Sequence, residues 1–170
     1  MKPETLRLEL ALNARAIQAL LSGVSQQQAQ QKPAPESWSM LEVICHLYDE
    51  EREDFRQRLD ILLHRPQDPW PPINPVGWVT ERQYNQKDFA GTLTAWSAER
   101  EKSLAWLDGL NTPDWDTTHP TPFGFEMAAG DMFASWVTHD TLHMRQLVEL
   151  RHALVVVLAQ PYDLRYAGDW

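Results

Sequence analysis

Apolar residues recur three, four and seven positions apart in four long segments of this sequence, and this spacing constrains the fold more than any other feature. On an α-helix these spacings gather the apolar side chains on one face, which a folded chain has to bury. The predicted helices cover residues 5–22, 39–63 and 88–110 and a fourth segment from about 126 onward. Four amphipathic helices without convincing strand segments predict an all-α fold, a four-helix bundle.

The 12 prolines are concentrated between these segments and mark long crossover loops. Five of them lie between positions 66 and 75, so we expect no regular helix through residue 76. Trp70 and Trp78 in the same stretch indicate an ordered crossover that packs against the bundle. The next loop is marked by Pro113, Pro120 and Pro122.

Local signals also place the ends of the helices. Ser39 followed by Glu42 predicts a capping box at the start of the second helix. Gly23 and a Gln/Ala/Pro-rich stretch end the first helix. Near the end of the sequence, residues 155–157 are three valines, which are compatible with either helix or a short strand.

Length, charge and composition exclude several classes of protein. A chain of 170 residues that is 43% hydrophobic predicts one domain over residues 1–170 with a single core. A net charge of −9 disfavours nucleic acid as a partner. We find no stretch of about 20 apolar residues and no signal-peptide pattern, so we expect no membrane span. The single cysteine, Cys45, fits a reducing compartment and predicts a cytoplasmic protein, in which Cys45 packs in the core.

Two histidines stand out on the fourth predicted helix. His139 and His143 are four residues apart and fall on its apolar stripe, so both rings should point into the bundle. A cation shared by two neutral imidazoles would satisfy both buried rings. Two core histidines with hydrogen-bonding neighbours explain the spacing equally well, so the pair alone leaves both interpretations open.

His46 on the second helix lies away from the main apolar stripe and close to acidic residues. A second apolar flank, which includes Val43 and Leu47, permits His46 to be covered by a neighbouring helix. Glu50 follows one turn later on the same face and is the candidate general base or additional ligand. The alternative is that Glu50 belongs to a solvated acidic face with Asp49.

Two further charged residues have alternative interpretations. Arg100 interrupts the apolar stripe of the third helix and is a candidate for binding an anionic group of a substrate. The alternative is a snorkelling arginine paired with a carboxylate on the bundle surface. Asp140 is a candidate for orienting a ligating ring, although it points about 100° away from His139.

Two motifs of the sequence resemble the DinB-like superfamily, which includes YfiT-like metal-dependent hydrolases and thiol-dependent transferases. They are Trp-Ser-Met with the following His-Leu-Tyr-Asp-Glu-Glu at 46–51, and His-Asp-Thr-Leu-His-Met-Arg-Gln-Leu at 139–147. The resemblance spans nearly the whole chain and implies a four-helix bundle of up-up-down-down style. It also implies a metal site formed by His46, His139 and His143.

A three-histidine site leaves at least one coordination position open, as catalytic sites do. The Irving–Williams order favours zinc, nickel or copper, while iron and manganese stay open. The resemblance implies a metal-dependent hydrolase or transferase acting on a small-molecule substrate, in some relatives with a low-molecular-weight thiol. The alternative is a non-catalytic metal-binding or stress-associated protein. Eight tryptophans are many for one small bundle and suggest a homodimer.

Overall fold

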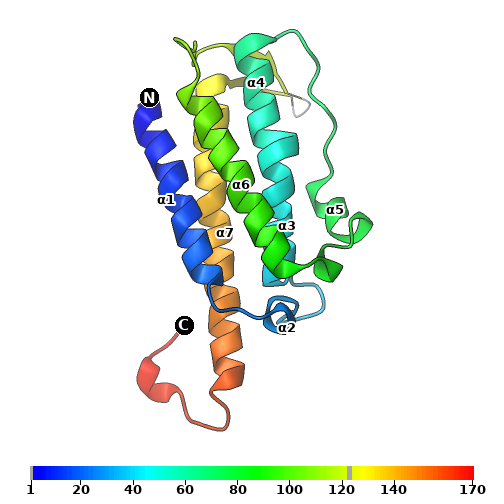
Figure 1. The fold of residues 1–170 in the computed structure, drawn as a ribbon, viewed down its shortest axis with the longest axis vertical. Coiled ribbons are helices and arrows are strands. Elements are labelled where there is room, and N and C mark those ends of the chain that lie inside the picture. The colour runs from blue at the N-terminus through cyan, green and yellow to red at the C-terminus, as the bar shows by residue number, and fades with distance from the viewer. Residues whose placement is uncertain (1, 122–123) are drawn as a thin grey trace.

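The computed structural model describes residues 2–121 and 124–170, so Pro122 lies outside the described part. The body of the molecule is a bundle of four long helical segments (Figure 1). They are α1 (Pro3–Leu21), α3 continued by η1 and α4 (Met40–Glu50, Glu51–Phe55 and Arg56–His64), α6 (Phe89–Asp108) and α7 (Ala129–Leu158). The smaller elements are α2 (Gln26–Ala29), α5 (Pro75–Glu81), η2 (Tyr84–Gln86), β1 (Thr118–Pro120), β2 (Glu126–Ala128) and η3 (Arg165–Ala167). The predicted four-helix bundle is confirmed.

The directions of the four long helices differ from the up-up-down-down order that the resemblance implies. As Figure 1 is drawn, α1 descends, α3 and α4 ascend, α6 ascends and α7 descends. Side-chain contacts agree with these directions: Asn13 on α1 donates to the carbonyl of Val137 on the parallel α7, and Arg7 on α1 pairs with Asp108 on the antiparallel α6. The crossover that contains α5 therefore joins two parallel helices.

Local chemistry explains where the long helices begin. The Ser39 hydroxyl accepts a hydrogen bond from the Glu42 amide, and the Glu42 carboxylate accepts one from the Ser39 amide, so the predicted capping box is confirmed. At α6, the Asp88 carboxylate accepts from the Gly91 amide at 2.6 Å. Each cap satisfies amide groups that have no acceptor inside the helix.

Several elements differ from the sequence-based prediction. Helix α5 begins at Pro75, where we expected no helix, because the first position of a helix requires no N–H donor. Residues 126–128 form strand β2, which pairs with β1, so the last helix begins three residues later than predicted. The second helix contains a π-helical turn, η1, which periodicity did not indicate. The three valines at 155–157 are helical.

The crossover packs against the bundle as predicted, with Trp70 and Trp78 only 8% and 7% exposed. Trp96 and Trp136 are buried almost completely in the centre of the bundle. Four of the eight indoles are thus buried within one chain. The number of tryptophans is therefore no longer an argument for a homodimer. No helix in the described part of the chain is long and apolar enough to cross a membrane.

Candidate metal centre

Two helices bring the three histidines together. His46 projects from α3, and His139 and His143 project from α7, one turn apart. His46 is 5% exposed and the other two are partly buried. The second apolar flank of α3 explains the burial of His46, because Val43 and Leu47 are also buried.

The three rings converge through their Nε2 atoms. The Nε2 atom of His139 lies 3.4 Å from that of His46 and 3.2 Å from that of His143. One nitrogen from each ring lies within 4.8 Å of those of the other two. Ligand nitrogens held about 2.0–2.1 Å from a tetrahedral ion lie about 3.3 Å apart, so this spacing fits a shared ion.

The hydrogen bond made by Nδ1 indicates which nitrogen of an imidazole carries the lone pair that can bind a metal ion. Nδ1 of His143 lies 2.9 Å from Oε1 of Gln146, an oxygen that only accepts, so we assign the proton to Nδ1. Nε2 of His143 is then a lone pair that faces His139. Nδ1 of His46 is buried and has no hydrogen-bonding partner within the described residues. A cation at the centre would satisfy all three converging nitrogens, which hydrogen bonds between the rings cannot do.

Burial keeps the three imidazoles neutral. It lowers the pKa of His46 to about 2 and that of His139 to about 3, with a further contribution from repulsion by the neighbouring imidazoles. Burial also lowers the pKa of His143. Because a metal ligand has to be unprotonated, a metal ion would displace no proton from these rings at neutral pH.

Aromatic side chains surround the cluster. The ring centroid of Trp38 lies 5.0 Å from that of His46. The Trp38 ring is also parallel to the His143 ring, with centroids 6.3 Å apart. The ring centroid of Phe55 lies 4.9 Å from that of His139. These contacts restrict the orientations of the rings and reduce access of water from these sides. Neither aromatic residue was assigned to the site from the sequence.

Glu50 does not belong to the solvated acidic face that we considered, since it is only 4% exposed. It is also not part of the group of converging ligand atoms found among the described residues, which contains the three histidines alone. Burial and the neighbouring Asp54 carboxylate raise the pKa of Glu50 well above its ordinary value. Glu50 is therefore protonated at neutral pH and donates to Asp54, which pairs with Arg58 at 2.8 Å.

This protonation state predicts the behaviour of Glu50→Gln. A carboxyl group with a raised pKa stabilises the fold below the unfolded-state pKa of about 4.3 and loses that stabilisation as the pH rises. Relative to wild type, Glu50→Gln should therefore gain about 1 kcal/mol in free energy of unfolding per pH unit between about pH 5 and 8. Urea denaturation at several pH values measures this gain. The exposed Glu101→Gln is the control, and parallel pH profiles for wild type and Glu50→Gln would contradict the assignment.

The structure places Arg100 in the core, 2% exposed. Its Nε and Nη2 donate to the two oxygens of Glu51, both at 2.8 Å, and Nη1 and Nη2 donate to those of Asp140 at 2.7 and 2.9 Å. Nη1 also donates to the carbonyl of Leu10 at 3.1 Å. All five N–H donors of Arg100 are engaged. A substrate could bind Arg100 only by displacing these groups, and Asp140 orients Arg100 instead of a histidine ring.

Cys45 is a packed core residue, as expected. It is 4% exposed and burial raises the pKa of its thiol to about 12. His64 and His152 lie outside the histidine cluster, and His119 is held by the carbonyls of Pro120 and Asp68. None of these residues joins the candidate metal centre.

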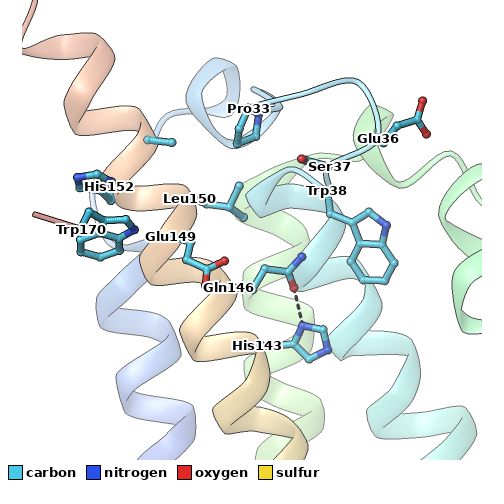
Figure 2. A pocket seen from close by; sticks show the side chains of 11 residues that line it. Pro33, Glu36, Ser37, Trp38, His143, Gln146, Glu149, Leu150, His152 and Trp170 are labelled. Carbon is cyan, nitrogen blue, oxygen red and sulfur yellow. Dashed lines mark hydrogen bonds between the residues drawn. The ribbon is translucent and has the colours of Figure 1, made fainter.

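A cavity of about 730 Å³ adjoins the cluster and is lined by His143, Gln146 and Trp38 among others. Figure 2 shows it between α7 and the loop that precedes α3. This volume is in the range of small-molecule sites. Periodicity within single helices could not predict the cavity, because its two walls are far apart in the sequence.

Comparison with known proteins agrees with this architecture. The family model of the DinB superfamily matches residues 9–147. Among solved structures, the chain is similar to YfiT from Bacillus subtilis with a TM-score of 0.79 and 15% sequence identity, over 90% of this chain and 87% of that one. YfiT is described as a probable metal-dependent hydrolase with an unusual four-helix bundle topology. No curated protein matches the sequence. Because the family model covers most of its length, the chain belongs to the DinB superfamily.

Proposed function

We propose that this protein is a metal-dependent enzyme, a hydrolase or transferase, that acts on a small molecule. The ion would be held by His46, His139 and His143. The observation that supports this best is the convergence of three neutral Nε2 atoms at separations of 3.2 and 3.4 Å. All three residues belong to one chain, so the proposal requires no second copy.

A divalent ion at such a centre supplies Lewis acidity, which polarises a substrate oxygen or lowers the pKa of a water or thiol. The protein's own residues would do the rest. Gln146 holds the ring of His143 through Nδ1. Trp38 packs against the rings of His46 and His143 and restricts their orientations. Glu50 stays the candidate for proton transfer, and its raised pKa makes it a proton donor at neutral pH instead of the general base we first considered.

The alternative is a non-catalytic metal-binding protein. A closed site without space for a substrate would favour it, whereas the cavity beside His143 favours an enzyme. Zinc and nickel are the metals we propose first, with iron and manganese as further candidates, because three imidazoles suit all of them. A low-molecular-weight thiol as co-substrate is compatible with an open coordination position but is supported by no separate contact.

Metal content tests the proposal. We expect wild-type protein to carry about one ion per chain, and His46→Ala, His139→Ala and His143→Ala each to lose it. The control is His64→Ala, since His64 is exposed and pairs only with Asp60 in the described structure. Elemental analysis after purification and after reconstitution with each candidate metal measures the content. Retention of the ion by all three variants, or a metal-free wild type after reconstitution, would refute the site and the function together.

A further inference from the structure

The residues that line the cavity beside His143 indicate which class of substrate it can bind. One wall is formed by α7, where Gln146 and Glu149 follow His143 at helical spacing. The opposite wall is the loop that leads into α3, with Glu36 and Trp38 (Figure 2). The cavity therefore extends from the candidate metal centre along the lower half of α7.

An aromatic pair lines the part of the cavity that is far from the candidate metal centre. The indole of Trp170 stacks on the imidazole of His152, with ring centres 4.0 Å apart and planes at 6°. Trp170 comes from the last segment of the chain, which turns back toward α7 after residue 160 (Figure 1). Trp38 lies near the metal centre, and Figure 2 shows the indoles of Trp38 and Trp170 on opposite sides of the cavity.

The charge of the lining has one sign. Its carboxylates are Glu36 and Glu149, and no lysine or arginine is among the described residues that line the cavity. Glu149 pairs loosely with the exposed Arg145 at 3.6 Å. The basic residue Lys32 pairs with Glu42 at 2.7 Å and is not among the residues that line this cavity. Indole faces and carboxylates are the groups that bind organic cations in proteins.

We propose that this cavity selects a small molecule that carries a positive charge, such as an ammonium group, and presents it to the three-histidine centre. The inference rests on the proposed function, because it names the substrate class of that same site. The cation would lie in the cavity that Trp38, Trp170, Glu36 and Glu149 help to line, and the group to be transformed would face His143. A thiol that carries several carboxylates is disfavoured, because the described lining offers no cation to receive them.

Three probes of similar size and different charge test this selectivity. They are benzyltrimethylammonium, benzyl alcohol and phenylacetate, titrated into the full-length protein as purified and again after chelation. A quaternary ammonium cannot ligate a metal ion, so its binding reports the cavity alone. We expect the cation to bind about tenfold more tightly than phenylacetate in the chelated protein, as followed by calorimetry.

Two sets of variants identify the groups responsible. Glu36→Gln combined with Glu149→Gln should weaken binding of the cation about tenfold, and Trp170→Leu should weaken it about threefold. The matched control is Glu101→Gln combined with Glu81→Gln, which changes the net charge equally at two exposed residues outside this cavity. We expect the control to change the affinity less than about twofold.

Each outcome decides the inference. It is overturned if phenylacetate binds the chelated protein as tightly as the cation, if the cation does not bind at about 10 mM, or if the cavity variants match the control. Metal content is measured on the same samples. Metal-free wild type with a clear cation preference would refute the proposed function and leave the selectivity of the cavity standing, whereas a bound metal without the preference would do the reverse.

Discussion

Arg100→Met is expected to lower the free energy of unfolding by about 3–5 kcal/mol, because it leaves two buried carboxylates without their counter-charge. Glu51 is 1% exposed at its side chain and Asp140 is completely buried, and Arg100 bridges them with two pairs of hydrogen bonds. Without the guanidinium, the two acids would repel each other in a medium of low polarity. Urea denaturation followed by circular dichroism measures the loss.

A rescue and a control separate this explanation from simple loss of packing. Combining Arg100→Met with Glu51→Gln and Asp140→Asn removes the uncompensated charges and should restore most of the lost stability. The matched control is Arg7→Met, because Arg7 and Asp108 form a bidentate pair that is exposed. We expect that variant to lose less than about 1 kcal/mol. Equal losses in Arg100→Met and Arg7→Met would show that the buried network contributes little.

His46→Leu is expected to make the metal-free protein less sensitive to acid. The pKa of His46 is lowered to about 2 in the folded protein, whereas an unfolded chain has a histidine pKa of about 6.5. Between these values the unfolded state binds a proton that the folded state does not, so stability is complete above about pH 6.5 and is lost as the pH falls. The leucine variant lacks this contribution, which amounts to about 1 kcal/mol per pH unit.

The quantity to measure is the difference in free energy of unfolding between His46→Leu and wild type from about pH 7 to 4.5, with a chelator present. The difference removes the contribution of Glu50, whose raised pKa acts in the opposite direction in both proteins. His64→Gln is the control, because His64 is exposed. A difference that stays constant over this range would mean that the imidazole of His46 is not held neutral by burial.

The positions of the long helices were predictable because their determinants are local. Side chains three or four residues apart share a helix face whatever the rest of the chain does, and the cap at Ser39 depends on a residue only three positions away. The same reasoning placed His139 and His143 on one face. It left open whether His46 would meet them, because that depends on how α3 packs against α7. The assignment of all three to one site came from the resemblance.

Burial of charge was not predictable in this way. For both Glu50 and Arg100 the sequence allowed an exposed position on the surface, because a sequence does not show which neighbours cover a side chain. The structure buries both. The partners of Arg100 come from distant positions, since Asp140 is 40 residues and Glu51 is 49 residues away, whereas the partner of Glu50 is the nearby Asp54. Their pKa values and energetic roles follow from those partners.

The sequence by itself determined the helical content, the acidic character and the placement of His139 and His143 on one helix face, because each depends on composition or on short-range spacing. That His46 lies beside them depends on the packing of α3 against α7. Only the tertiary structure decided that the imidazoles are held neutral, that Arg100 is committed to the core, and that a cavity with acidic and aromatic walls adjoins His143. These properties arise where segments far apart in the chain exclude water from one another, and solvent exclusion is a property of the packed molecule.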